Sequence, residues 1–217
     1  MPLLFWPDIL IIASDMPKTL PACLVLASAS PRRRELLWQL GVPHDATPAA
    51  IDERRLPGEG MEQCVQRLAH QKAERVFGWQ QSGQRLPVLA ADTIVVLGDR
   101  LLGKPAGRAE GLAMLQLLSG NEHRVLTAVA IQTDAGIGSH LSESRVRFRE
   151  LNADECAAYW DTGEPCDKAG AYAIQGYAAA FIGELQGSYS GVMGLPLYET
   201  ADLLRRSGIA VWQRVPA

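Results

Sequence analysis

Residues 86–97 read LPVLAADTIVVL, an apolar and β-branched composition that favours a strand over a helix. Gly98-Asp99 follows as a hairpin turn signal, and Leu101-Leu102 continues the apolar pattern after it. Asp92 stands in the middle of the run, where a carboxylate is unfavourable unless it is paired, hydrogen-bonded or bound to a metal ion. The stretch therefore predicts a buried strand that carries one charged group.

Short apolar runs alternate with amphipathic helices on both sides of this strand. Ser30-Pro31 opens a helix that we expect to end near Leu40, because Ser is a good N-cap and Pro fits the first helical position. Asn152 starts another helix, with Glu155 at capping-box spacing and Gly163 as its stop. We expect further helices at 61–77, 108–118 and 196–206, and strands at 23–27, 123–133 and 143–151, the last two joined by a Gly- and Ser-containing loop. The alternation predicts one compact α/β unit with a cleft between two lobes.

Composition narrows the class of protein. The chain has 217 residues, of which 47% are hydrophobic and 21% are charged, and its formal net charge is −3. This length can bury about 70% of the unfolded surface without a disulfide or a structural metal. The values exclude wholesale disorder, collagen-like chains and coiled coils. The slightly acidic balance argues against a protein that coats nucleic acid, so a polyanion site must be a local concentration of Arg and Lys.

We expect residues 1–20 to form a loosely attached extension and residues 21–217 to form a single domain. The apolar stretch at 3–13 contains Asp8, follows no Lys or Arg, and is too short to span a bilayer, so no membrane association is expected. Met16 is an alternative start of the chain. The four cysteines lie far apart without a C-x-x-C pair, which indicates free or buried thiols in a reducing cytosol and hence a cytoplasmic protein.

Arginines crowd the start of the first predicted helix, in the stretch SASPRRR at residues 28–34. Each cation at the N-terminal end of a helix opposes the macrodipole by about 0.3–1 kcal/mol at low salt, so the stretch breaks a local rule. Free N–H groups, the hydroxyls of Ser28 and Ser30, and the guanidinium groups of Arg32 and Arg33 together suggest a phosphate cradle. The alternative is a solvated basic patch, because long Arg side chains can bend away from the dipole.

Asp92 gains a functional interpretation beside such a cradle. Taken alone, it also fits a structural role in which the carboxylate accepts backbone N–H groups. Beside arginines it is better explained as a metal ligand or a general base, and oxygen ligands favour Mg²⁺ or Mn²⁺. Weaker signals, each typical of solvated surface when taken singly, are Lys72, Lys104, the charged segment 51–55, and Gln175 within the Gly-rich segment 163–176.

Sequence blocks that contain these residues are spread over about residues 23–204: SASPRRRELL, IDERR, AADTIVV, LLGKP, LSGNEHRVLTAVA, GEPCDKAGAYAIQG and GSYSGVMGLPLYET. In this order they resemble the Maf family of nucleoside triphosphate pyrophosphatases. The resemblance implies a mixed α/β fold with a bent central sheet flanked by helices and two lobes around a deep cleft. It also implies a homodimer and a metal-dependent hydrolysis of a nucleoside triphosphate to the monophosphate and pyrophosphate, with Mg²⁺ or Mn²⁺ as the cofactor.

Three short motifs are similar to the dTTP- and UTP-cleaving branch of that family: Ser-Pro-Arg-Arg at 30–33, Ala-Asp-Thr at 91–93 and Ile-Gln-Gly at 174–176. The branch that acts on 7-methyl-GTP has Trp after the Pro, Gln after the Asp and Glu before the last Gly. The resemblance makes Asp92 the proton acceptor, and we expect Asp92 and Glu53 to hold the metal. It assigns substrate choice to Arg32, Thr93 and Gln175, and further polar positions of the cleft to Ser28, Arg33, Glu53, Lys72 and Lys104. Ala173, where Gly is more usual, and residues 191–193 depart from the family pattern.

The expected reaction begins when Asp92 orients or deprotonates a water molecule that attacks the α-phosphorus in line. Gln175 is expected to pair with N3–H and O4 of uracil or thymine. One alternative is the same reaction on modified purine triphosphates such as 7-methyl-GTP. Another is a non-catalytic regulator of cell division that binds nucleotide or nucleic acid. The charge of −3 weighs against nucleic acid, so the expected partners are a nucleoside triphosphate and a second copy of the chain.

Overall fold

The computed structural model describes residues 21–83 and 85–212, so the predicted extension at 1–20 and the alternative start at Met16 lie outside the described residues. A seven-stranded sheet runs in the order β2-β1-β3-β5-β6-β7, with β4 paired to β3. β1 is parallel to β2 and to β3, whereas the other pairs are antiparallel, so the predicted mixed α/β class is confirmed. The strands are β1 (Leu24–Leu26), β2 (His44–Ala46), β3 (Val88–Leu97), β4 (Arg100–Leu102), β5 (Glu122–Thr133), β6 (Gly136–Phe148) and β7 (Ile182–Gln186).

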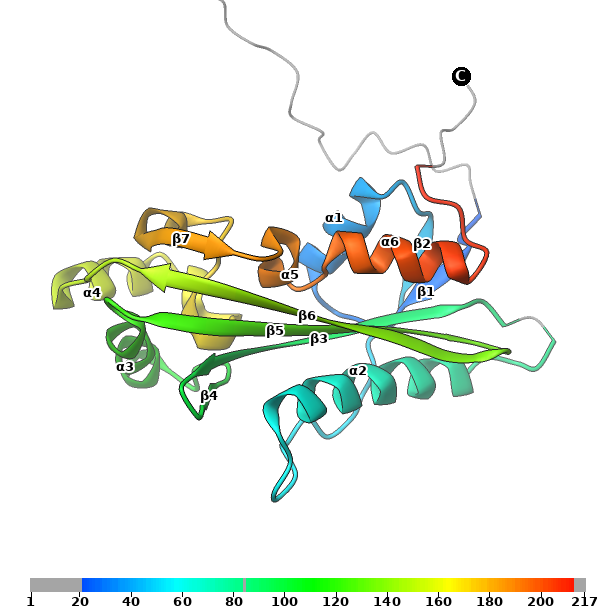
Figure 1. Cartoon of the computed structure of the whole chain (residues 1–217), viewed down its shortest axis with the longest axis horizontal. Helices are drawn as coiled ribbons and strands as arrows, with labels where there is room; N and C mark the ends of the chain where they lie inside the picture. Colours follow the sequence, from blue (N-terminus) through cyan, green and yellow to red (C-terminus); the bar gives the residue numbers. More distant parts are fainter. Residues whose placement is uncertain (1–20, 84, 213–217) are drawn as a thin grey trace, which may run out of the picture.

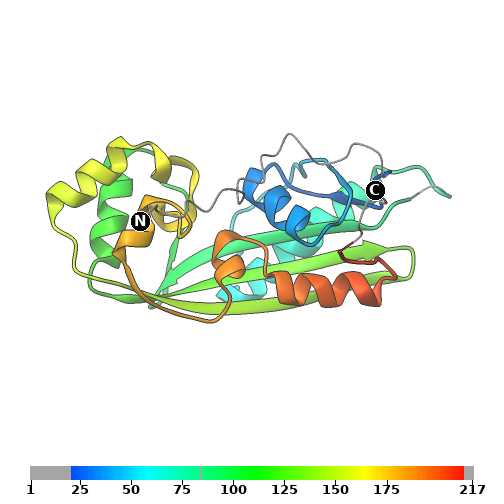
Figure 2. The ribbon, with the colours of Figure 1, turned by 90° about the horizontal axis from the view of Figure 1, so that it is seen from above.

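Helices cover both faces of this sheet (Figure 1). On one face, α2 (Met61–Gly78) packs against β3 and β5. On the other face, α5 (Tyr189–Met193) and α6 (Leu197–Arg206) pack against β5 and β6, with α1 (Pro31–Gln39) beside them. Figure 2 shows α3 (Arg108–Leu118) and α4 (Ala153–Asp161) packed together at one end of the sheet.

Successive residues of β3 enter different cores, as the two-residue period of a strand requires. Leu89 and Ala91 pack with apolar residues of α1 and α6. Ala90 and Ile94 pack on the opposite face with apolar residues of α2. The same alternation directs Asp92 toward α2 and Thr93 toward α1, which decides what each polar side chain can reach.

Local signals located most elements correctly. Ser30 caps α1 by accepting the N–H of Arg33 at 3.5 Å, and Gly41 takes a φ of 63° just after the helix ends. Asn152 and Glu155 form the expected capping box of α4. The helix predicted at 108–118 matches α3 residue for residue.

The extent of other elements was predicted wrongly. Residues 136–142, expected as part of a loop, belong to β6, because a tight turn at Asp134–Ala135 lets Thr133 pair directly with Gly136. Leu86 and Pro87 precede β3 rather than starting it. β2 and β7 were not predicted, because neither segment has the apolar pattern of a strand. The Gly-rich segment 163–176 forms the 3₁₀ turns η1 (Glu164–Asp167) and η2 (Ala169–Ala171), and a third 3₁₀ turn, η3 (Tyr177–Phe181), follows it.

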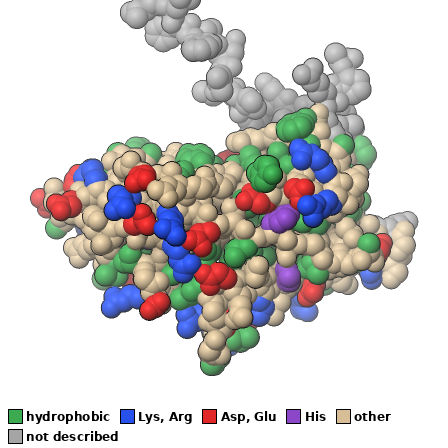
Figure 3. Space-filling model, in the orientation of Figure 1, with side chains coloured by type: hydrophobic (Ala, Val, Ile, Leu, Met, Phe, Trp, Pro, Cys, Tyr) green, Lys and Arg blue, Asp and Glu red, His purple; other side chains and the backbone are tan. Residues whose placement is uncertain are grey.

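Basic and acidic side chains lie beside one another on the face drawn in Figure 3. Arg147 of β6 pairs with Glu122 of β5 at 2.9 Å and with Glu184 of β7 at 3.5 Å. Val146 and Phe148 flank Arg147 in β6 and are buried, so this part of β6 has one apolar and one charged face. No helix within residues 21–83 and 85–212 combines the length and the apolar character needed to cross a bilayer.

Candidate active site

The edge of β3 is open over its central residues. β1 pairs with β3 only as far as Leu89, and β4 pairs with it only from Val95 onward. Residues 90–94 therefore have no strand partner on this side among the described residues, although β5 pairs with them on the other side. An interruption of this kind exposes both sheet faces at one place, so Asp92 and Thr93 can border the same space.

A cavity of about 350 Å³ lies at this open edge. Arg32 and Asp92 share it, as a polyphosphate site between a basic turn and a strand requires. Arg34, the third arginine of the cluster, is exposed and does not line the cavity. Every side chain that the sequence selected lines it: Ser28, Ser30, Arg32, Arg33, Glu53, Lys72, Asp92, Thr93, Lys104 and Gln175. Their chemical roles stay predictions.

Lys72 joins two carboxylates at the floor of this cavity. Its Nζ lies 2.6 Å from Oδ1 of Asp92 and 2.6 Å from Oε1 of Glu53. Lys72 and Asp92 are each 7% exposed, whereas the Glu53 side chain is 55% exposed. Lys72 reaches Asp92 because it lies on the face of α2 that packs against β3, together with Ala69, Ala73 and Val76.

The two carboxylates differ in proton affinity. Burial raises the pKa of Asp92 above its usual value, although the charges of Lys72 and Arg33 and the hydrogen bond from Lys72 oppose that rise. Burial also acts on Glu53, but the hydrogen bond from Lys72 and the charges of Lys72, Lys104 and Arg33 outweigh it and lower the pKa of Glu53. Such divergence is typical of carboxylates with separate roles, and it makes Asp92 the better proton acceptor of the two.

These carboxylates also form the candidate metal site. The described residues contain no group of three or more His, Cys, Asp and Glu side chains placed to hold an ion. Asp92 and Glu53 nevertheless converge on one point, where the ammonium group of Lys72 now lies. Two carboxylate oxygens fit a hard cation such as Mg²⁺, which usually completes its coordination with substrate phosphates and water.

Arg33 is held by a closed ring of hydrogen bonds. Its Nε donates to the carbonyl oxygen of Gly194 at 2.7 Å, and its Nη2 donates to Oγ1 of Thr93 at 3.1 Å. The hydroxyls of Thr93 and Thr127 lie 3.0 Å apart, and Thr127 donates to the carbonyl oxygen of Gly191 at 2.8 Å. The N–H of Gly194 donates to that same oxygen at 2.9 Å, which closes the ring. Thr93 thus bonds Arg33 directly, and burial lowers the pKa of the Arg33 guanidinium, with the charge of Asp92 opposing.

Ser28 and Ser30 lie in the arginine turn, residues 28–34, and their hydroxyls accept hydrogen bonds from nearby backbone N–H groups. Ser28 Oγ accepts the N–H of Ser30 at 3.1 Å, and Ser30 Oγ accepts the N–H of Arg33 at 3.5 Å. Both hydroxyls act as acceptors in these contacts, so each retains its own O–H as a donor for an anion in the cavity.

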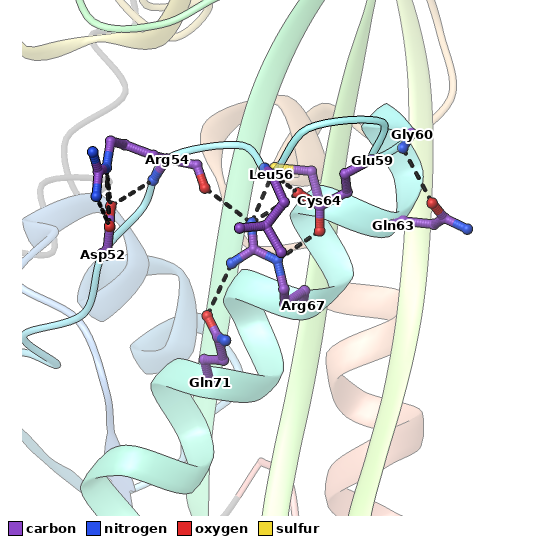
Figure 4. A network of polar contacts seen from close by, with 9 residues as sticks. All are labelled: Asp52, Arg54, Leu56, Glu59, Gly60, Gln63, Cys64, Arg67 and Gln71. Carbon is purple, nitrogen blue, oxygen red and sulfur yellow. Dashed lines mark hydrogen bonds and ion pairs between the residues drawn. The ribbon is translucent and has the colours of Figure 1, made fainter.

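A loop between β2 and α2 carries Glu53 to the site. Figure 4 shows the contacts between this loop and Arg67. Arg67 of α2 holds this loop by donating to both carboxylate oxygens of Glu59, at 2.6 and 2.8 Å, and to the carbonyl oxygen of Arg54 at 3.1 Å. The hydrogen bonds from Arg67 and from the N–H of Leu56 lower the pKa of Glu59 to about 2. The same loop borders a second, more open space of about 1030 Å³ beside α2. Asp52, Arg54 and Arg55 of the charged segment 51–55 line this second space, but none of the ten predicted residues that line the first cavity does.

Three cavity residues with polar side chains were missed by the sequence reasoning. Lys168 and Asp167 line the cavity as an ion pair, and Tyr172 lines it while its hydroxyl lies 2.8 Å from Nε2 of His123. Burial would raise the pKa of Asp167, but the hydrogen bond and charge of Lys168 and the charge of Arg32 lower it. The available signal was the charged pair between closely spaced glycines in the segment 163–176.

Comparison with known proteins identifies relatives over most of the chain. The family model described as "Maf-like protein" matches residues 23–207. The chain is similar to proteins described as dTTP/UTP pyrophosphatase from Bordetella parapertussis and Bordetella bronchiseptica, each 52% identical over 206 residues, which cover 92% of this chain and 97% of the relative. A protein with the same description from Hahella chejuensis is 50% identical over 189 residues, which cover 87% of this chain and 94% of the relative.

Proposed function

The chain belongs to the Maf family, and on this basis we propose that it is a dTTP/UTP pyrophosphatase, which hydrolyses each substrate to the monophosphate and pyrophosphate. The observation that carries the proposal is the convergence of Asp92, Lys72 and Glu53 with the arginine turn at one cavity. A proton acceptor of raised pKa beside several cations is what the attack of water on a triphosphate needs.

Cationic side chains bind the polyphosphate in this proposal. Arg32, Lys104 and Lys168 line the cavity, and Arg33 keeps donor capacity beyond the two hydrogen bonds that hold it. Their positive charges offset the charge that grows on the departing pyrophosphate.

Asp92 acts on the attacking water. Its free carboxylate oxygen accepts one water proton while the water oxygen forms a bond to the α-phosphorus. The bond from that phosphorus to the bridging oxygen breaks, and the pyrophosphate leaves with the electron pair. Lys72 keeps Asp92 in one orientation through the 2.6 Å hydrogen bond. Asp92 and Glu53 would hold a divalent cation, Mg²⁺ or Mn²⁺, which when bound neutralises charge on the phosphate oxygens.

The base is proposed to occupy the less polar part of the cavity, beside Val125, Val192 and Tyr172. There the amide of Gln175 pairs with N3–H and O4 of uracil or thymine. Cytosine presents no N3–H and carries an amino group at the O4 position, so an amide held in the orientation that suits uracil faces cytosine with mismatched donors and acceptors, which lowers its binding. Arg32 and Thr93 complete the specificity positions, with Thr93 acting through Arg33.

The proposal extends to the whole molecule. Residues 21–217 form one domain, with residues 1–20 as an extension, and the two ends of the sheet with their helices form two lobes around a cleft. The active unit is a homodimer, and the location is the cytoplasm, where nucleoside triphosphates are made and used. Sedimentation of the purified full chain tests the dimer, since a monomer at micromolar concentration would contradict it.

A pyrophosphate-release assay tests the function directly. The substrates are dTTP, UTP, dCTP, GTP and 7-methyl-GTP, each with Mg²⁺, with Mn²⁺ and with EDTA. We expect dTTP and UTP to have the highest kcat/KM and EDTA to abolish turnover. A preference for 7-methyl-GTP would favour the purine branch. Binding of oligonucleotides without any hydrolysis would favour a regulator and contradict the proposal.

A further inference from the structure

Two side chains that lie outside the cavity accept hydrogen bonds from the backbone of the turn that carries Gln175. Gln175 lies between η2 and η3, is exposed and lines the cavity. The N–H of Gly176 donates to the carbonyl oxygen of Ala173 at 3.1 Å, which closes the turn. The two side chains are those of Tyr159 of α4 and Glu164 of η1, and neither lines the cavity.

Tyr159 binds the start of the turn. Its hydroxyl oxygen accepts the N–H of Ala173 at 3.2 Å, and its O–H donates to Oε1 of Glu164 at 2.7 Å. Tyr159 is 3% exposed, and burial together with Glu164 raises its pKa above the usual value for tyrosine. The hydroxyl therefore stays protonated at neutral pH and keeps both hydrogen bonds.

Glu164 binds the end of the turn. Its Oε2 accepts the N–H of Tyr177 at 2.9 Å, and its Oε1 accepts the N–H of Ala178 at 3.3 Å. Gly176 leaves the space that this carboxylate fills, because a Cβ on residue 176 would lie 1.9 Å from Oε2. The backbone is thus fixed on both sides of Gln175 by one connected pair of side chains.

We propose that Tyr159 and Glu164 are positioning residues for the amide of Gln175, and through it determine the preference for a base that carries N3–H and O4. This inference rests on the proposed function, in which Gln175 reads the base. A side-chain amide discriminates between bases only when its donor and acceptor ends are held in one orientation, and that requires a fixed backbone. A purely structural role would stabilise the fold without changing the choice of base.

The test uses the full chain with Tyr159→Phe and Glu164→Gln, each of which preserves the size of the side chain. We expect each variant to lower the ratio of kcat/KM for dTTP to that for dCTP by about fivefold or more, with dTTP turnover losing most. The matched control is Glu155→Gln. Glu155 belongs to the same helix as Tyr159 and accepts a backbone N–H at 3.0 Å, but it does not line the cavity. The ratio of kcat/KM for dTTP to that for dCTP in Glu155→Gln should equal the wild-type ratio.

A double-mutant cycle separates positioning from folding. In a Gln175→Ala background, Glu164→Gln should cause no further loss of the dTTP preference, because the amide through which it acts is gone. An equal loss in both backgrounds, or an unchanged ratio in both single variants, overturns the proposal. Gly176→Ala provides a third perturbation of the same contact and should reproduce the effect of Glu164→Gln.

Failure of the proposed function has a different signature. A wild-type protein that releases no pyrophosphate from dTTP or UTP overturns both proposals. Active wild type with unaffected variants overturns only the positioning. Hydrogen exchange at the amides of residues 173–178 measures the turn without substrate. Exchange should be faster in Tyr159→Phe and Glu164→Gln than in the wild type, and unchanged in Glu155→Gln. Equal protection in all three variants would contradict the idea that Tyr159 and Glu164 hold the turn.

Discussion

At the scale of single residues, Lys72 holds two carboxylates in different environments. Asp92 is buried, so its charged form is disfavoured and its pKa rises, whereas Glu53 is largely exposed and surrounded by cations that lower its pKa. The ammonium group of Lys72 therefore contacts two carboxylates of different proton affinity, a stronger proton acceptor in Asp92 and a weaker one in Glu53. The difference in pKa favours Asp92 over Glu53 for the proposed proton transfer and suits Glu53 to binding a cation.

Asp92→Asn should lower kcat by about 10²–10⁴-fold, the usual contribution of a general base, because an amide cannot accept the water proton. Lys72 keeps Glu53 as a partner in this variant, so the far-UV circular dichroism spectrum should match the wild type. Asp45→Asn is the control, since Asp45 is exposed on β2 and lies outside the cavity. A kcat for Asp92→Asn close to that of wild type would remove Asp92 from the mechanism.

His123 predicts a pH dependence of stability that is separate from catalysis. It is 1% exposed, and burial lowers its pKa from 6.5 to about 4. Between these values the unfolded chain binds more protons, so stability is present above pH 6.5 and is lost as the pH falls toward 4. Urea unfolding at pH 7 and pH 4.5 should show a loss of about 2 kcal/mol that His123→Gln lacks. An equal loss in both proteins would assign the acid sensitivity to other groups.

At the scale of elements, the alternation of side chains along β3 and the ends of its neighbouring strands determine where the polar side chains of the cavity lie. β3 directs Asp92 to α2 and Thr93 to α1, and the ring through Thr93 and Thr127 ties Arg33 to the end of α5. Thr127 is fully buried at 0% exposure and touches no part of the cavity itself. Its hydroxyl therefore acts on the cavity only through the groups that it contacts, the hydroxyl of Thr93 and the carbonyl of Gly191.

Thr127→Val should lower kcat/KM for dTTP about tenfold, because it nearly preserves shape while it leaves the carbonyl of Gly191 and the hydroxyl of Thr93 without this partner. The free energy of unfolding should fall by about 1 kcal/mol, as for a typical lost hydrogen bond. Thr127→Ser retains the hydroxyl and should recover most of the activity, as steady-state kinetics would report. Equal kinetics for the Val and Ser variants would show that the ring does not set the position of Arg33.

Elements with strong local signals were predictable from sequence, and those created by tertiary contacts were not. The caps of α1 and α4 and the apolar run of β3 are local, so their places were correct. β2 has only three residues and depends on pairing with β1, and residues 136–142 carry polar and glycine residues that a long hairpin stabilises. Among site residues, Asp92 was visible as a charge in an apolar strand. Tyr159 and Glu164 could not be predicted from the sequence, because their hydrogen bonds are to a turn that lies beside them only in the folded chain.

At the scale of the whole molecule, the cavity is assembled from segments that are far apart in the chain. α1, the loop before α2, β3 and the Gly-rich segment 163–176 each supply part of its lining. Within the part of the chain that the structure describes, no group of three or more His, Cys, Asp and Glu side chains is placed to hold an ion. We expect the proposed Mg²⁺ or Mn²⁺ to complete its coordination with substrate oxygens and water. Because the proposed ion has only the two carboxylates of Asp92 and Glu53 as protein ligands, we expect it to contribute little to the stability of the fold.

EDTA should abolish turnover yet leave Tm within about 1 °C of the untreated value, unlike proteins whose folding depends on a structural metal. Addition of Mg²⁺ with a non-hydrolysable dTTP analogue should raise Tm, because the ligand binds only the folded state. Differential scanning fluorimetry measures both effects. A fall of several degrees with EDTA alone would indicate a structural ion and contradict this view.

Nine residue pairs join β3 to β5, from Val88 with Gln132 to Val96 with Arg124. A slip of one position along this ladder would turn each side chain to the opposite side, so Asp92 would meet α1 and Thr93 would meet Lys72. A misaligned pairing of β3 with β5 would thus still resemble the native sheet in outline, but it would separate Asp92 from Lys72. The length of the pairing therefore helps to specify the register, since every added residue pair makes the shifted register less favourable during folding.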